Sequence, residues 1–175
     1  MTTTLYHLTN AQNARDILAD GEIIDGVTKR ERTGAPSGVV APEYDHLIDG
    51  VVWLTTNRSA KQAWQAHDFK WQVRFTLDVP DARPWREYAD EAGLPDWYAN
   101  MLCYPGTQPD TWYIAPGPIT ESDWKQIDLT VGERRIWVAG QDIVRAIPPV
   151  ELAYRQEQAE LRKIWNAQQT AVLRG

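Results

Sequence analysis

The stretch TLYHLTNAQNARDILADG, residues 4–21, has the pattern of a short strand that runs directly into a capped helix. Side chains alternate between the two faces of a strand, so His7 and Thr9 are expected to share one face. Asn10 suits the N-cap position, because its side chain accepts hydrogen bonds from the first helical amides. Gly21 suits the C′ position, where a left-handed backbone ends a helix. We therefore expect the chain to begin with a strand–helix unit.

The predicted helix is amphipathic. Its apolar residues recur at helical spacing, at Ala11, Ala14, Ile17 and Leu18. A helix N-terminus favours anions and donates backbone hydrogen bonds, so the strand–helix junction with His7, Thr9 and Asn10 is a candidate ligand site. The other interpretation of His7 is an ordinary hydrogen-bonded histidine of the core or the surface.

The composition indicates one domain over residues 1–175, with length enough to bury a core. The chain has 18 Lys and Arg and 24 Asp and Glu, so its net charge is -6. Nucleic-acid binding would therefore need a local basic site. Cys103 is the only cysteine, which precludes a disulfide within the chain and fits a reducing cytoplasm. We recognise no signal peptide and no membrane-spanning apolar run, so a cytoplasmic protein without a membrane partner is expected.

Periodicity predicts more strands than helices, which favours the α+β class. Strands are expected over 51–56, 71–79, 111–115, 133–139 and 143–147. Helices are expected after Asn57 or Ser59, over 84–91, 96–102 and 120–126, and as a C-terminal amphipathic helix over 151–173, within 150–175. The strand over 51–56 is apolar on both faces, which is typical of a central strand.

Glu133 is the most suggestive carboxylate of the chain. Alternation along the strand puts Glu133, Arg135 and Trp137 on one face, opposite Ile136 and Val138. A carboxylate, a guanidinium and an indole on one face can line a ligand cleft. The alternative is an exposed sheet face that carries a salt bridge.

A basic cluster, Lys29, Arg30 and Arg32, lies in a Gly-containing loop after the first helix. A solvated charge run is one interpretation, and a phosphate clamp is the other, since the fork of an arginine fits a pyrophosphate. The three histidines and the single cysteine show no metal-ligand spacing, so no metal site is expected. The chain also lacks a nucleophile elbow and the glycine motifs that bind phosphates.

Taken in order, these motifs resemble the ADP-ribosyltransferase superfamily, nearest to its DarT-like enzymes that modify nucleic acid. The opening Tyr6-His7-Leu8-Thr9, with Ile17-Leu18 and Gly21, is similar to the family's Y-H-x-T…I-L-x-x-G. Lys29-Arg30 is similar to a loop with an NAD-contacting arginine. Tyr44-Asp45-His46 followed by 51–55 is similar to the second core strand. The segment 133–138, followed by 143–147, is similar to the catalytic-glutamate strand and its successor.

The resemblance implies an ADP-ribosyltransferase-like split β-sheet core, with flanking helices, that binds NAD as a co-substrate. The implied NAD-binding residues are His7, Thr9, Asn10, Arg30, Arg32, Trp53 and Thr55. Among them, His7 and Thr9 would hold the nicotinamide-side ribose, and Trp53 would flank the nicotinamide. Glu133 would bond the ribose 2′-OH and help activate the acceptor, with His7 as the second catalytic residue. A fixed carboxylate stabilises the positive charge that develops on the ribose as the nicotinamide bond breaks.

These expectations describe an enzyme that moves ADP-ribose from NAD to a macromolecule and releases nicotinamide, in a setting such as a compact toxin. The acceptor, whether DNA, RNA or protein, is open. One alternative is a non-catalytic protein-binding or inhibitor domain, since nine Trp on an acidic chain suit an interface. Another is an RNA 2′-phosphotransferase, which also uses NAD.

Overall fold

The strand–helix unit at the start of the chain forms as its sequence predicts. The computed structural model describes residues 3–25, 28, 44, 46–48, 50–59, 72–101, 108–130 and 134–140. Strand β1 (Leu5–Thr9) leads into helix α1 (Ala11–Asp20). Asn10 caps this helix by accepting a hydrogen bond from Asn13 N, and Gly21, with φ of 72°, ends it.

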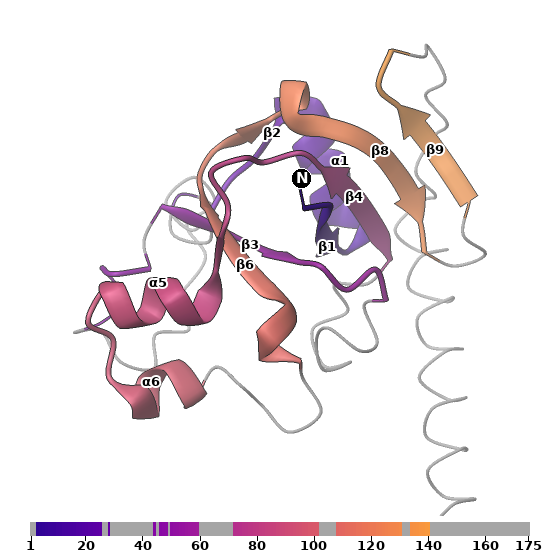
Figure 1. The fold of residues 1–175 in the computed structure, drawn as a ribbon. Coiled ribbons are helices and arrows are strands. Elements are labelled where there is room, and N and C mark those ends of the chain that lie inside the picture. The colour runs from indigo at the N-terminus through magenta and orange to yellow at the C-terminus, as the bar shows by residue number, and fades with distance from the viewer. Residues whose placement is uncertain are drawn as a thin grey trace, which may run out of the picture.

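Seven strands form one sheet, in the order β5-β6-β3-β1-β4-β8-β9 (Figure 1). Besides β1, they are β3 (Val51–Thr55), β4 (Val73–Leu77), β5 (Arg83–Pro84), β6 (Trp112–Pro116), β8 (Trp124–Leu129) and β9 (Arg134–Val138). Two short strands, β2 (Glu22–Ile23) and β7 (Ile119–Thr120), pair separately. Every strand pair in the described part of the chain is antiparallel, so the fold mixes helices with an antiparallel sheet. Strand β3 lies between β6 and β1, the central position that its apolar sequence predicts.

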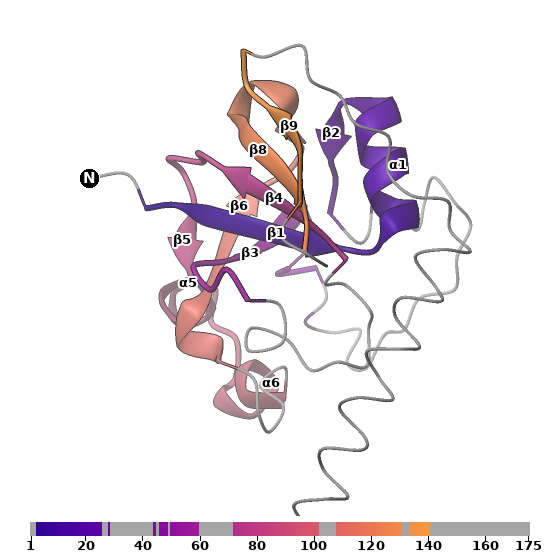
Figure 2. The ribbon, with the colours of Figure 1, turned by 90° about the vertical axis from the view of Figure 1, so that its right-hand side faces the viewer.

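Helices cover the two faces of the sheet at different places. Figures 1 and 2 show α1 and β2 on one side, and helices α5 (Trp85–Glu91) and α6 (Asp96–Met101) on the other. Pro84 occupies the N-cap of α5, close to the helix start that was predicted there. Helices α5 and α6 pack on β3 and β6 through a second apolar cluster centred on Trp85 and Trp112, which are 0% and 2% exposed.

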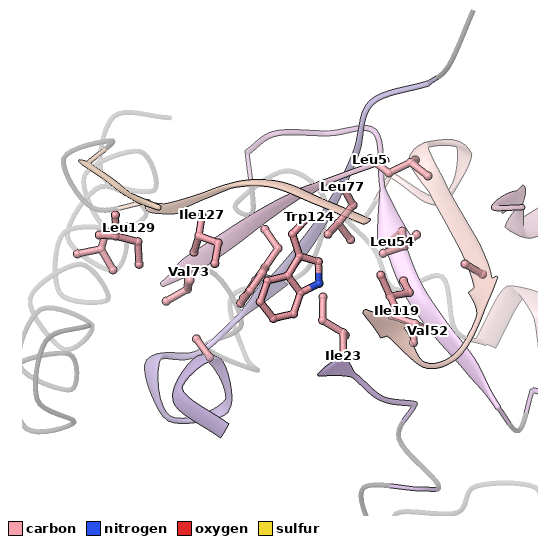
Figure 3. Packing of buried hydrophobic residues seen from close by; sticks show 14 residues of the cluster. Leu5, Ile23, Val52, Leu54, Val73, Leu77, Ile119, Trp124, Ile127 and Leu129 are labelled. Atoms are coloured by element: carbon pink, nitrogen blue, oxygen red, sulfur yellow. The ribbon is translucent and has the colours of Figure 1, made fainter. Parts of the chain in front are cut away.

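The main core lies between the sheet and the unit formed by α1, β2 and β7. Figure 3 shows its packing, in which Trp124 lies among aliphatic side chains from several strands. Its buried members are Leu5, Ala14, Ile23, Val52, Leu54, Val73, Phe75, Leu77, Ala115, Ile119, Trp124, Ile127, Leu129 and Ile136. We call the side of β1, β4, β8 and β9 that contributes to this core the apolar face.

The strand register shows which other side chains share a face. Directly paired residues of antiparallel strands project to the same side of a sheet. The rows on the apolar face are Leu5–Leu77–Trp124, His7–Phe75–Ile127–Trp137 and Thr9–Val73–Leu129–Arg134. The rows on the opposite side are Tyr6–Thr76–Gln126–Val138 and Leu8–Arg74–Asp128–Arg135. We call this second side the polar face, because all but two of these side chains are polar.

One predicted helix is wrong. The sequence predicts a helix over 120–126, and Thr120 does form a capping box with Asp123. The helix is a single 3-10 turn, Glu121–Asp123, after which the chain forms β8. Strand β8 pairs with β4 on one side and β9 on the other, and these two ladders outweigh the local helical signal.

Alternation along β9 is also broken. Asp128 pairs with Arg135, and Ile127 pairs with Trp137, so Ile136 is the extra residue of a β-bulge. Arg135 therefore faces Asp128 on the polar face, whereas Trp137 lies against Trp124 on the apolar face, with ring centroids 6.3 Å apart. The prediction that Arg135 and Trp137 share a face is wrong for this reason.

Three predicted elements lie outside the described residues. They are the helix after Asn57 or Ser59, the strand over 143–147 and the C-terminal helix over 151–173. A further 3-10 turn that the sequence did not indicate, Pro109–Thr111, precedes β6.

Candidate functional site

His7 lies where β1 and β3 separate. In the described residues these two strands share a single bridge pair, Tyr6 with Thr55, whereas β1 pairs with β4 along its whole length. His7 Nδ1 lies 3.1 Å from the backbone oxygen of Trp53, so the imidazole bonds β3 where the ladder is open. A carbonyl oxygen only accepts hydrogen bonds, so this contact requires a proton on Nδ1 and makes Nε2 the acceptor nitrogen of the neutral ring.

At the strand–helix junction, backbone amides of the first turn of α1 donate hydrogen bonds to side chains of the protein. Ala11 N donates to Gln72 Oε1 at 2.9 Å, and Asn13 N donates to Asn10 Oδ1 at 2.7 Å. Two amides of the first helical turn are therefore satisfied by protein oxygens. Thr9 is only 3% exposed, beneath this turn. The N-terminus of α1 is thus hydrogen-bonded to Gln72, the residue that precedes β4.

Trp53 and Thr55 project from β3 toward the side that carries α5. The Trp53 ring packs against Trp85 and Trp112, with centroids 4.7 and 5.9 Å away. Thr55 is fully buried, and its hydroxyl lies 3.0 Å from Thr111 Oγ1 and accepts a bond from Asn57 N at 3.0 Å. The contacts described for both side chains are with the protein.

Glu133, Arg30 and Arg32 lie outside the described residues. The residue after Glu133, Arg134, begins β9 and lies in the same row as Thr9. Strands β4 and β8 separate β1 from β9, so the two strands are three strand spacings apart, about 14 Å. Both strands therefore belong to one sheet but are not neighbours, and β9 lies on the other side of β1 from β3.

A buried ion pair on the polar face is the feature that sequence reasoning missed. Arg74 Nη2 donates to Asp128 Oδ2 at 2.9 Å, and only 1% and 3% of their side chains are exposed. Arg74 Nη1 also donates to the backbone oxygen of Arg58 at 3.3 Å, and its guanidinium lies 5.9 Å from the centre of the Tyr6 ring. Charged side chains are rarely buried unless they are paired. The burial of Arg74 is therefore explained by its ion pair with Asp128.

Two residues extend the ion pair toward solvent. Gln126 Nε2 lies 2.7 Å from both carboxylate oxygens of Asp128. Arg135 Nε lies 3.9 Å from Asp128 Oδ1, and the Arg135 side chain is 62% exposed. Two guanidinium groups thus approach one carboxylate in the described part of the chain.

A signal for this cluster is present in the sequence. In 72–77 and in 126–129, polar and apolar residues alternate strictly, so Arg74, Gln126 and Asp128 fall on the polar side of predicted or predictable strands. The helix prediction over 120–126 obscured the second of these patterns. Without β8 as a strand, nothing in the sequence brings Asp128 to Arg74.

Within the described ranges, no three His, Cys, Asp or Glu side chains gather as a metal ion would need, and no helix has the length and apolarity to span a bilayer. No family model and no curated protein matches the sequence. Among solved structures, the chain is similar to the Scabin toxin from Streptomyces scabies in complex with NADH. The TM-score is 0.41 and the identity 13%, over 83% of this chain and 78% of that chain.

Proposed function

We propose that this chain is an NAD-dependent ADP-ribosyltransferase that transfers ADP-ribose to a macromolecule and releases nicotinamide. One observation carries the proposal. Strand β1, with His7, and strand β9, which directly follows Glu133 in the chain, belong to one antiparallel sheet although they are far apart in sequence. The ordered motifs that resemble this superfamily start on the first of these strands and include the second, and the last of them, 143–147, lies outside the described residues.

The proposed reaction breaks the bond between C1′ of the ribose and the nicotinamide nitrogen. Nicotinamide leaves with the bonding electron pair, and positive charge develops on the ribose. An oxygen or nitrogen of the acceptor then forms the new bond to C1′ and loses its proton to a carboxylate. Glu133 is proposed to bond the ribose 2′-OH, to stabilise the positive charge and to take up this proton.

His7 is proposed to position the nicotinamide-side ribose. Its bond to the Trp53 carbonyl keeps the imidazole in the opening between β1 and β3 and fixes the proton on Nδ1. Thr9 is proposed to hold this ribose together with His7, Asn10 to contact NAD at the same strand end, and Arg30 or Arg32 to contact the diphosphate. Trp53 is proposed to flank the nicotinamide, with Thr55 beside it on β3, and their described side-chain contacts are with Trp85 and Thr111.

Nicotinamide release from NAD, in the presence of cell lysate as a source of acceptors, tests the proposal. The wild-type protein is expected to release nicotinamide, and Glu133→Gln is expected to lose at least a hundredfold of this activity. Glu121→Gln is the matched control, because Glu121 is exposed in a 3-10 turn and undergoes the same chemical change. Labelled NAD in the same reaction identifies which fraction of the lysate accepts ADP-ribose.

Two outcomes would overturn the proposal. The wild-type protein would neither release nicotinamide nor gain thermal stability with NAD, although a ligand that binds only the folded state raises its melting temperature. Alternatively, Glu133→Gln would keep normal turnover. If His7→Ala abolished turnover while Glu133→Gln was mild, an RNA 2′-phosphotransferase would replace the transferase.

A further inference from the structure

Trp97 is the one large apolar residue that is well exposed in the described part of the chain, at 54%. It lies in the first turn of α6, and its ring contacts those of Tyr44 and Tyr98, with centroids 5.6 and 5.8 Å away. The interplanar angles are 74° and 90°, so neither tyrosine ring is parallel to the indole. These two rings restrain the exposed indole, and a side chain that is already ordered loses less entropy on binding.

The surface around Trp97 belongs to a hairpin of two helices. Figure 1 shows α5 and α6 side by side, joined at one end by a short connection. At the other end, Arg86 Nη1 in the first turn of α5 donates to Asn100 Oδ1 in the last turn of α6 at 2.8 Å. Asp90, in the last turn of α5, therefore lies at the same end of the hairpin as Asp96 and Trp97. All three are exposed, and we call them the Trp97 end.

The hairpin is negatively charged. Residues 81–101 contain five Asp and Glu and two Arg, so their net charge is -3. Arg83 is paired with Glu91, and the other arginine lies at the opposite end of the hairpin, bonded to a neutral amide. Asp90 and Asp96 take part in none of the ion pairs that the described residues form. The Trp97 end thus combines a restrained, exposed indole with two carboxylates that are not neutralised by an ion pair in this part of the chain.

We propose that the Trp97 end binds an arginine-bearing segment of a protein partner. A guanidinium is planar, so it stacks on an indole face through a cation–π contact, and its fork pairs with a carboxylate. The ammonium of lysine is a compact and strongly hydrated charge that lacks this plane. The negative charge of the hairpin disfavours a nucleic acid, whose affinity comes from protein cations. The proposed contact involves neither NAD nor transfer chemistry, so it does not rest on the proposed function.

Titration of the full chain with hexa-arginine and with hexa-lysine, two peptides of equal charge, tests the surface at low salt. NMR detects the indole N–H of Trp97, and calorimetry measures the affinities. The wild-type protein is expected to bind hexa-arginine about threefold more tightly than hexa-lysine, with a shift of the Trp97 signal. Trp97→Ala is expected to bind the two peptides equally, whereas Trp97→Phe keeps an aromatic face and should keep a preference for hexa-arginine.

Asp90→Asn with Asp96→Asn tests the carboxylates separately from the indole. This double variant is expected to weaken both peptides by about threefold or more, because two local charges are lost. Asp16→Asn with Asp20→Asn is the matched control, since it removes two exposed carboxylates from α1, on the other side of the sheet, and should weaken the peptides less.

Three results would overturn the proposal. They are equal affinities of the wild-type protein for the two peptides, an unchanged preference in Trp97→Ala, and equal losses in the two double variants. Sedimentation of the isolated chain distinguishes the other occupant: a dimer that Trp97→Ala dissociates would assign this surface to a second copy of the chain instead. The titrations contain no NAD, so failure of the transferase assay leaves their result unaffected, and the reverse also holds.

Discussion

Arg74 and Asp128 join β4 to β8 through an ion pair of 2.9 Å that is almost completely withdrawn from solvent. The desolvation of two charges offsets most of the attraction between them, so such a pair adds little net stability. Removing one partner is different, because the other charge is left buried without compensation. The fold is therefore expected to be intolerant of a substitution that removes only Arg74 or only Asp128.

Asp128→Asn is expected to lower the free energy of unfolding by about 3 kcal/mol or more, because Arg74 stays buried and charged. Urea denaturation at neutral pH measures this loss. A double variant, Arg74→Met with Asp128→Leu, should recover most of it, because the variant carries no buried charge at these positions. Losses that simply add in the double variant would contradict this account.

Gln72 and Asn10 both accept hydrogen bonds from the first turn of α1, but Gln72 is buried. Gln72→Leu leaves the Ala11 amide without its acceptor and is expected to cost about 1–3 kcal/mol. Asn10→Ala removes the N-cap acceptor of Asn13 and is expected to cost about 1 kcal/mol. Thermal denaturation of the two variants compares these costs, and a neutral Gln72→Leu would show that the long-range cap is dispensable.

The local signals at the start of the chain were sufficient to predict its structure. The cap at Asn10 and the left-handed Gly21 act between neighbours in sequence, so the residues themselves determine β1 and α1. The position of Pro84 predicted the start of α5 in the same way. The β8 strand was not predicted, because the capping box at Thr120 is local and the ladders that form β8 come from distant strands.

The polar face could be predicted only in part for a similar reason. Alternation places Arg74 and Asp128 on the polar side of their own strands, but only the register between β4 and β8 makes them partners. The bulge at Ile136 places Trp137 on the apolar face and leaves Arg135 on the polar face. The residue types in β9 do not predict this bulge. His7 was correctly placed on one face with Thr9, but its bond to the Trp53 carbonyl depends on the opening between β1 and β3.

Arg83 and Glu91 form an exposed ion pair that provides a pH-dependent contribution to stability. The hydrogen bond from Arg83, and then its charge, lowers the pKa of Glu91 below its ordinary value. A lowered pKa in the folded state stabilises the protein above the pKa of the unfolded chain, and this contribution is lost as the pH falls through the folded pKa. Arg83→Gln should therefore be less stable than the wild-type protein at neutral pH and equally stable below the Glu91 pKa.

Urea denaturation across the acidic range measures this convergence. High salt should reduce the difference at neutral pH, because exposed charges are screened. The double variant Arg83→Gln with Glu91→Gln is the control, and it should show none of the pH dependence that is specific to this pair. A constant difference between wild type and Arg83→Gln at every pH would mean that packing of the arginine stem causes it.

Trp124 gives the last prediction, because its indole nitrogen is buried in the core and has no hydrogen-bond partner among the residues that the structure describes. The ring packs against Phe75, with centroids 5.2 Å apart, and aliphatic side chains surround it in Figure 3. Trp124→Phe loses apolar contact but also removes a buried N–H that costs about 1–3 kcal/mol when unsatisfied. The two effects oppose each other, so we expect a loss of less than about 1.5 kcal/mol, whereas Ile127→Ala in the same core should cost about 2–5 kcal/mol. Urea denaturation compares the variants, and a loss for Trp124→Phe as large as that for Ile127→Ala would mean that the indole nitrogen makes a stabilising bond in solution.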